Sequence, residues 1–223
     1  MKRRPEPELM DTVEQAQAYA EADFTEPNAL FLQLLEAQEP GDLGGARALD
    51  LGCGPADIVL RFLRRFPHAT CDALDGSQPM LDLALADLER EPEIASRARL
   101  ICDKLPSPRL ETGAYDLLLS NSLLHHLHDP QVLWRSLPVL GRPGAIVLIM
   151  DLMRPASASR AAAIVKHYAS DASAVLREDF HNSLFAAFEP AEVEQQLQDA
   201  GLERALSVQV VSDRHLAVSG RLP

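Results

Sequence analysis

The chain has 223 residues, of which 47% are hydrophobic and 24% are charged, and its formal net charge is −12 at pH 7. This length and balance are typical of a globular protein with one large core. The acidic excess disfavours broad binding to nucleic acids or to anionic membranes, because their phosphate groups repel a negative surface.

Two further features bear on the compartment. No apolar run reaches the roughly 18–20 residues that span a bilayer, and no apolar signal segment follows the basic start Met1–Arg4. The cysteines, Cys53, Cys71 and Cys102, form no C-x-x-C pair, and each lies in or beside a strand-like run. We therefore expect buried free thiols in a cytoplasmic protein.

The N-terminal part of the chain predicts a helical cap. Residues 1–10, rich in proline and charge, predict a loosely ordered lead-in. Helical spacing follows over residues 11–24, and a second helix begins at Glu26-Pro27. A Gly/Pro-rich stretch at residues 39–45 then interrupts the pattern. We expect residues 1–40 to form a cap within the same domain as residues 41–223.

From residue 47 onward, short apolar runs alternate with helical segments. This alternation is typical of a parallel sheet with right-handed crossovers. The predicted strands are residues 47–51, 71–74, 97–102, 115–120 and 144–152, and the predicted helices between them are residues 56–66, 79–88 and 130–140.

The C-terminal part changes pattern. Residues 158–188 are helical without a strand, and another helix covers residues 190–200. Two strand-like runs, residues 205–211 and 215–220, are joined by three residues only, which is too short for a helical crossover. The sequence thus predicts an α/β fold: a doubly wound, mostly parallel seven-stranded Rossmann-like sheet with a C-terminal antiparallel hairpin and the N-terminal helical cap.

The strongest motif is Asp50-Leu-Gly52-Cys-Gly54, where the first predicted strand meets its helix. Its glycines allow a sharp turn and a close approach of a ligand to backbone N–H groups. In an open parallel sheet this junction lies at the carboxyl ends of the strands, where ligands bind. The second predicted strand ends at Asp75, from which an acid can bond both hydroxyls of a ribose. These residues alone allow a nicotinamide dinucleotide or S-adenosylmethionine (SAM).

Three features favour SAM. First, an acid precedes the first glycine, which suits an ammonium or sulfonium group, and Asp57 occupies the third glycine position of a G-x-G-x-x-G fingerprint, where a phosphate would approach. Second, the fourth predicted strand runs into a polar cluster that begins at Asn121. Third, an ordinary dinucleotide-binding fold lacks the terminal hairpin.

With these motifs in this order, the chain resembles the class I SAM-dependent methyltransferases over about residues 45–220. Ala56 and Ala145 depart from the family pattern by replacing frequent glycines. The resemblance implies in-line transfer of a methyl group from SAM to an O, N, S or C nucleophile of a small-molecule acceptor. The matching segments are residues 50–54, 73–81, 115–127 and 140–148.

The resemblance also implies which residues hold the cofactor. Asp50 would lie near the ammonium group of SAM, Asp75 would hold the ribose, and Asp103 would accept from the adenine amino group. Asn121 would lie near the ammonium or the sulfonium. Two roles are equally open for Tyr19: it could form an aromatic wall of the site, or it could be a tyrosine of the core. The remaining implied residues are backbone or adenine-flanking positions: Gly52, Gly54, Gly76 and Met80.

A group of histidines follows the fourth predicted strand. His125, His126 and His128 with Asp129 look like a metal-ligand set, but neighbouring positions on a loop rarely converge on one ion. In families that resemble this chain the His-His-Leu sequence is simply the loop after that strand. We therefore expect no metal, and His126 is instead a candidate base on the acceptor side.

The long segment of residues 153–189 is expected to cover the site as a helical insertion and to select the substrate. Its mixed charges fit a small polar or zwitterionic acceptor, although a solvated cap or a dimer face, in a monomer or homodimer, is an alternative. Alignment alone supplies on the order of 7–11 kcal/mol, so a general base is optional. The candidates for substrate binding are Arg154, Arg177 and Asn182, and those for the base are His126, His181 and Asp151.

Two other functions share these cofactor motifs. An RNA methyltransferase would need a face lined by Lys and Arg, which the charge balance disfavours. A non-catalytic SAM-binding or scaffolding protein would bind SAM and S-adenosylhomocysteine without turnover. An NAD-dependent oxidoreductase is a weaker alternative, because no Tyr-x-x-x-Lys pair is present.

Overall fold

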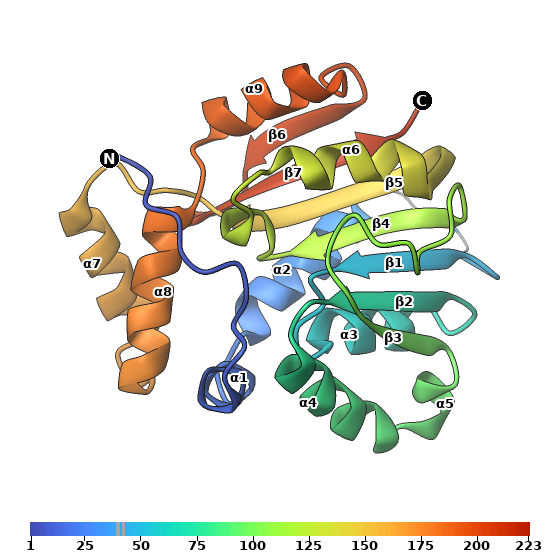
Figure 1. The fold of residues 1–223 in the computed structure, drawn as a ribbon, viewed down its shortest axis with the longest axis horizontal. Coiled ribbons are helices and arrows are strands. Elements are labelled where there is room, and N and C mark those ends of the chain that lie inside the picture. Colours follow the sequence, from blue (N-terminus) through green and yellow to red (C-terminus); the bar gives the residue numbers. More distant parts are fainter. Residues whose placement is uncertain (39–40, 42) are drawn as a thin grey trace.

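The computed structural model describes residues 1–38, 41 and 43–223, and within them one twisted sheet has seven strands in the order β3-β2-β1-β4-β5-β7-β6 (Figure 1). Strands β1 to β5 are parallel, and β7 runs antiparallel to both β5 and β6. The predicted fold class and hairpin are confirmed. The strands are β1 Arg47–Leu51, β2 Thr70–Asp75, β3 Ala98–Cys102, β4 Tyr115–Asn121, β5 Gly141–Leu152, β6 Leu206–Val210 and β7 His215–Arg221.

Helices cover both faces of this sheet. They are α1 Val13–Ala20, α2 Thr25–Glu36, α3 Asp57–Arg65, α4 Gln78–Glu89, α5 Pro92–Ala95, α6 Gln131–Leu140, α7 Ala158–Tyr168, α8 Ala174–Ala186 and α9 Pro190–Ala200, with a 3-10 turn η1 at Leu124–His126. The two elements that the periodicity did not predict, α5 and η1, are each about one turn long. Part of the predicted interruption, residues 39, 40 and 42, lies outside the described residues.

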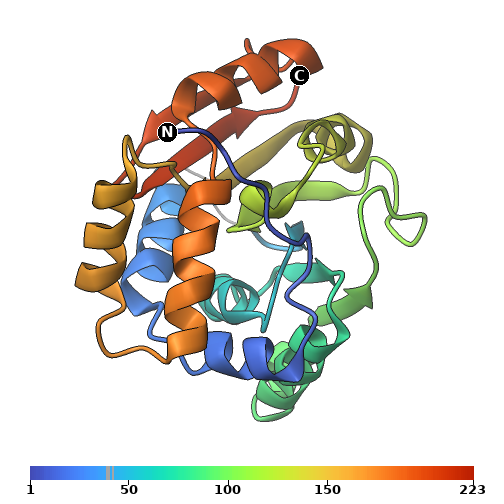
Figure 2. The same cartoon turned by 60° about the vertical axis from the view of Figure 1, so that its left-hand side comes forward.

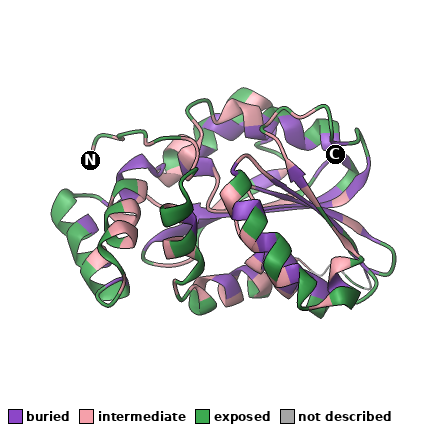
Figure 3. Cartoon of the chain, turned by 60° about the horizontal axis from the view of Figure 1, so that its bottom comes forward, coloured by how far each residue is buried: buried purple, intermediate pink, exposed green. Residues whose placement is uncertain are grey.

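The core divides into two layers because successive strand residues point to opposite faces. Leu117 and Leu119 of β4 pack with α2, α3 and α4, whereas Leu118 packs with α6 and α9. Burial on both faces explains why β4 is continuously apolar at its centre. The strands are accordingly buried, while the outer faces of the helices are exposed (Figure 3). None of the described helices combines the length and apolar character that a bilayer span requires.

The cysteines are free thiols, as predicted. Cys53 and Cys71 are buried, whereas Cys102 at the end of β3 is only partly buried. Burial raises the pKa of the Cys53 and Cys71 thiols well above the ordinary value, so both are unreactive packing groups.

Helices α1, α7 and α8 stand beyond the carboxyl ends of the parallel strands (Figures 1 and 2). Each of α1, α7 and α8 begins at a Ser or Thr N-cap whose side chain accepts a backbone hydrogen bond, and these caps are Thr12, Ser157 and Ser173. Such caps fix the residue at which each helix begins along the chain.

The N-terminal segment, residues 1–12, crosses the same end of the molecule (Figure 2). The Arg3 guanidinium donates to the carbonyl oxygens of Ala186, at 2.6 Å, and of His125, at 3.0 Å. Further along, Ser77 Oγ donates to the Met10 carbonyl oxygen at 2.8 Å. The prediction of a loosely ordered lead-in is therefore wrong, because side chains distant in sequence hold this segment at both of its ends.

Candidate active site

A cleft of about 370 Å³ opens at the carboxyl ends of β1, β2 and β4. We call it the first cleft. Parallel strands end at one edge of a sheet, which is why residues from separate motifs meet there. The first cleft is lined by all nine residues that the sequence analysis assigned to cofactor binding: Tyr19, Asp50, Gly52, Gly54, Asp75, Gly76, Met80, Asp103 and Asn121.

The turn after β1 forms the floor of the first cleft. Gly52 has φ +73°, and a Cβ atom there would lie 2.8 Å from the Cβ atom of Leu123. Its amide donates to the Leu74 carbonyl oxygen at 2.8 Å, which ties the turn to β2. Ala56 adopts φ +66°, a left-handed conformation that favours glycine, so the departure from the family pattern costs on the order of 1 kcal/mol here.

Asp75 is held at the end of β2 by backbone groups. Its Oδ2 accepts from the Gly54 amide and its Oδ1 from the Ser77 amide, both at 2.8 Å. Burial raises the pKa of Asp75, and these hydrogen bonds act in the opposite direction. Each carboxylate oxygen can accept two hydrogen bonds, so this fixed carboxylate keeps acceptor capacity for a ligand.

Asp50 lies deeper in the first cleft, and its electrostatic environment is unusual. The residue is 1% exposed, and neither carboxylate oxygen has a hydrogen-bond partner among the described residues. Burial, and secondarily the charge of Asp75, raise the pKa of Asp50 to about 7. A buried acceptor without a partner is rare in folded proteins, so this carboxyl group fits a ligand that brings a cation or a donor.

Asn121, at the end of β4, adds a second such acceptor. Its Oδ1 is buried without a partner within the described part of the chain, while its Nδ2 donates to Asn28 Oδ1 at 3.1 Å. Asn28 in turn donates to Asp57 Oδ2, and Arg61 Nε donates to Asp57 Oδ1 at 3.0 Å. Asn28 gave no signal in the sequence, because α2 carries no motif and only tertiary packing brings this residue to the cleft.

Asp103 and Tyr19 lie at the margins of the first cleft. Asp103 accepts from Ser107 Oγ at 2.6 Å and from the Lys104 amide at 2.9 Å, and these bonds lower its pKa. Tyr19 packs against Phe24 with ring centroids 4.5 Å apart. Burial raises the pKa of Tyr19, so its hydroxyl group is a protonated donor at neutral pH.

A second cavity, of about 680 Å³, adjoins the first cleft. Tyr19, Asn121 and His126 line both spaces, so the two communicate at these side chains. Helix α8 forms one wall with residues spaced three and four apart, as one helix face requires. These wall residues are Leu176, Asp179, Phe180 and Ser183.

The structure places the three predicted base residues differently. His126 lies where the two spaces meet, and burial, followed by the neighbouring His125, lowers its pKa to about 3. It is therefore neutral at pH 7 and a weak base. Asp151 lines neither space and instead accepts from the Leu124 amide at 2.7 Å and from His125 Nδ1 at 2.6 Å. His181 packs against the Phe185 ring, with centroids 4.8 Å apart.

The predicted placement of Asp151 and His181 beside an acceptor is therefore wrong. Asp151 sits behind His125, which lines the second cavity in its place. His181 lies outside the helix face that forms the cavity wall. Residues on one face of a helix are three or four positions apart, whereas His181 is five positions from Leu176 and one position from Phe180.

The predicted substrate-binding residues also lie outside both spaces. Arg154 is 7% exposed, and its guanidinium donates to Glu192 Oε1 at 2.8 Å and to the Ala187 carbonyl oxygen at 3.2 Å. Arg177 and Asn182 are exposed on α8, away from its cavity-lining face. These three predictions are wrong. Arg154 forms ion pairs with acidic side chains, and Arg177 and Asn182 lie on a face of α8 that points away from the second cavity.

Comparison with known proteins agrees with this geometry. A family model described as "Methyltransferase domain" matches residues 48–144. In fold, the chain is similar to a SAM-dependent methyltransferase from Aquifex aeolicus, with a TM-score of 0.66 and 17% identity over 93% of this chain and 98% of that one. Residues 48–144 are thus similar to a methyltransferase domain, and the whole chain has the fold of a SAM-dependent methyltransferase.

Two relatives of the chain have names that include an acceptor or a pathway. The mitochondrial 2-methoxy-6-polyprenyl-1,4-benzoquinol methylase of Caenorhabditis elegans is 33% identical over 115 residues, which cover 51% of this chain and 40% of that protein. The ubiquinone biosynthesis O-methyltransferase of Xanthomonas oryzae is 28% identical over 163 residues, covering 73% of this chain and 64% of that protein. The chain thus matches only about half of the length of such curated relatives.

Proposed function

We propose that this chain binds SAM in the first cleft and transfers its methyl group to a small molecule held in the second cavity. The observation that carries the proposal is the pair of buried, unpartnered acceptors on Asp50 and Asn121, next to the fixed carboxylate of Asp75. In this assignment residues 41–223 are the methyltransferase domain, residues 1–40 its cap, and residues 153–189 its substrate cover.

The chain's own residues would act by binding and alignment. Bound SAM supplies a methyl carbon that its sulfonium already activates. The Asp50 carboxylate would hold the ammonium group, Asp75 the ribose hydroxyls, and Asp103 the adenine amino group. With both reactants fixed, alignment contributes on the order of 7–11 kcal/mol to lowering the barrier. Tyr19, between the two spaces, would help to exclude water from the line of transfer.

The acceptor class follows from the second cavity and its charge. Acidic side chains outnumber basic ones around the second cavity, where they are Glu21, Asp23, Glu26, Asp171 and Asp179 against Arg214. Such a lining repels a phosphate backbone, which favours a small molecule over RNA. The names of the two relatives, a benzoquinol methylase and an O-methyltransferase of ubiquinone biosynthesis, support a small-molecule acceptor here as well.

Turnover separates an enzyme from a non-catalytic SAM-binding protein. We expect the purified chain, given isotope-labelled SAM and a small-molecule extract, to transfer the label to a low-molecular-mass product. Tight SAM binding without any labelled product, across extracts of varied origin, would favour the non-catalytic alternative. Label in RNA with a steep salt dependence would instead favour an RNA methyltransferase.

Asp75→Ala is expected to weaken SAM binding by at least about tenfold, since it removes a charged acceptor of ligand hydrogen bonds. Titration calorimetry with SAM and with S-adenosylhomocysteine measures this effect. Asp82→Ala, an exposed acid on α4, is the matched control and should leave both dissociation constants unchanged. If Asp75→Ala binds as tightly as the parent chain, the ribose assignment is wrong.

Leu176→Trp is expected to reduce kcat/KM for the acceptor by at least about tenfold, because the larger side chain fills part of the second cavity. Leu176 lines the second cavity but not the first cleft, so SAM affinity should stay within about twofold. The control is Arg177→Ala, at the exposed neighbouring position. Weakened SAM binding in Leu176→Trp, or an unchanged kcat/KM for the acceptor, would contradict the division between the two spaces.

A further inference from the structure

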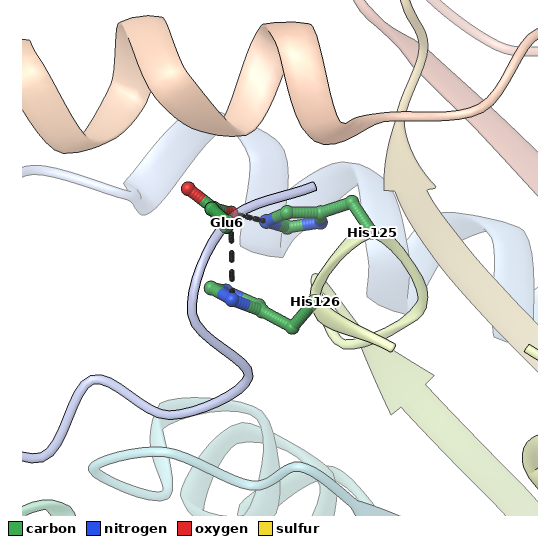
Figure 4. A group of neighbouring side chains, drawn as sticks. All are labelled: Glu6, His125 and His126. Carbon is green, nitrogen blue, oxygen red and sulfur yellow. Dashed lines mark ion pairs between the residues drawn. The ribbon is translucent and has the colours of Figure 1, made fainter. Parts of the chain in front are cut away.

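Three potential metal ligands converge where the N-terminal segment crosses the loop after β4. His125 Nε2 lies 3.5 Å and His126 Nδ1 lies 3.4 Å from Glu6 Oε1 (Figure 4). The three ligand atoms all lie within 4.8 Å of one another. Of the residues in the histidine motif, His125 and His126 face one carboxylate, because η1 and the path of the N-terminal segment bring both rings to Glu6.

The imidazole of His125 is already oriented for coordination. Its Nδ1 lies 2.6 Å from Asp151 Oδ1, and the other oxygen of Asp151 accepts from the Leu124 amide. A carboxylate accepts, so Nδ1 is the donor of this bond, and the lone pair of the neutral ring lies on Nε2, facing Glu6. A histidine whose second nitrogen donates to a carboxylate is the usual outer shell of a metal ligand.

The distances also suit a metal ion. Bonds of about 2.0–2.1 Å at tetrahedral angles place two ligand atoms roughly 3.4 Å apart. The observed separations of 3.5 and 3.4 Å from Glu6 Oε1 match that value. Two imidazoles with one carboxylate form a ligand set that binds zinc and other first-row divalent ions and leaves coordination positions open.

The surrounding charges favour a cation at this point. Glu6 and Asp151 bring two carboxylates, whereas Arg3 directs its guanidinium to the carbonyl oxygens of His125 and Leu127. Nearby, Ser183 Oγ donates to Glu6 Oε1 at 3.0 Å and so fixes the carboxylate. Without a cation or an added proton, the lone pair of His125 Nε2 and the Glu6 oxygen repel each other.

We propose that Glu6, His125 and His126 form a binding site for one first-row divalent cation such as Zn²⁺, with its open positions toward the second cavity. Both histidines line that cavity, so an oxygen, nitrogen or sulfur donor of a molecule bound there reaches the ion. A role for the ion in holding the methyl acceptor rests on the proposed function, whereas the metal site itself does not.

The test uses the full-length chain without an affinity tag, stripped with a chelator and titrated with Zn²⁺ by calorimetry. We expect one ion per chain, with an affinity that falls at least tenfold in Glu6→Gln and in His126→Ala, as loss of a ligand requires. His68→Ala removes an exposed histidine elsewhere and should bind like the parent chain. Thermal melts followed by circular dichroism check that each variant is folded.

Co²⁺ provides a second readout, since its visible absorption reports coordination geometry. The parent chain should give an intense spectrum of low coordination number that Glu6→Gln and His126→Ala lose. If no stoichiometric ion binds, or if all folded variants bind alike, the cluster is only an ion pair of a protonated His125 with carboxylates, and the proposal is wrong. Failure of the proposed function would differ: Zn²⁺ binding would persist while SAM binding was absent.

Discussion

Asp50→Asn is expected to weaken SAM binding by at least about tenfold and, at the same time, to stabilise the ligand-free protein. The binding loss corresponds to about 1.4 kcal/mol or more, the scale of a lost charged hydrogen bond to the ligand. The stabilisation has a separate cause: the folded chain buries the Asp50 carboxyl group with no partner for either oxygen among the described residues. A neutral amide removes the cost of burying that charge, about 4 kcal/mol at pH 8 for a pKa raised from 3.8 to about 7.

The pH dependence of this effect has a definite sign. The pKa of Asp50 is raised from 3.8 to about 7, so between these values the folded state binds a proton that the unfolded state has released. The contribution of Asp50 to the free energy of unfolding is therefore present at low pH and is lost as the pH rises through about 7. SAM affinity should change in the opposite sense and rise over this range, because the ionised carboxylate binds a cation.

Urea unfolding and titration calorimetry at about pH 5 and about pH 8 measure both effects. Asp72→Asn is the matched control, since Asp72 is buried on the neighbouring strand but accepts from Arg99 Nη2 at 2.6 Å and from Tyr115 Oη at 2.7 Å. It should destabilise the chain and leave SAM affinity nearly unchanged. A destabilised Asp50→Asn with unchanged SAM affinity would mean that Asp50 has a structural role that the described contacts do not reveal.

Asp151→Ala is expected to lower the free energy of unfolding by about 3 kcal/mol. The substitution leaves the Leu124 amide and the His125 ring as buried donors without a partner, and each unmade bond of this kind costs about 1–3 kcal/mol. Because η1 begins at Leu124, the loop that lines both spaces loses its anchor on β5. Chemical unfolding of the ligand-free chain measures the loss.

Asp151→Asn separates the effect of Asp151 on the orientation of the His125 ring from its effect on the free energy of unfolding. The amide retains one acceptor for the Leu124 amide, so the free energy of unfolding should fall less than in the alanine variant. Its NH₂ group donates to His125 Nδ1 and moves the ring proton to Nε2, which removes the lone pair from the proposed metal site. We expect at least a tenfold loss of Zn²⁺ affinity. Equal Zn²⁺ affinity in the parent and Asp151→Asn chains would show that Asp151 does not orient His125.

Much of the fold was predictable because its signals are local. Strand bounds at β1 and β4 followed from apolar runs, and the short connection between β6 and β7 excluded a helical crossover. The order of the motifs then placed Asp50, Asp75 and Asn121 at one sheet edge, since the ends of parallel strands must meet there. Their gathering around one cleft is a consequence of topology that the sequence pattern contains.

The acceptor side was not predictable, because it depends on how distant elements pack. Whether Leu176 or Arg177 faces the second cavity is decided by the phase of α8 against the sheet, and helical spacing alone left that phase open. Arg154 donates a hydrogen bond to Glu192, which lies thirty-eight residues further along the chain. Glu6 gave no signal at all, since only the path of the N-terminal segment brings it to His125 and His126.

A crystal structure of the chain grown with S-adenosylhomocysteine tests the proposed cofactor site most directly. We expect ligand density in the first cleft, with the amino group at Asp50, the ribose hydroxyls at Asp75 and the adenine beside Met80. Density at another place on the chain, or no density at a concentration that saturates binding in solution, would contradict it.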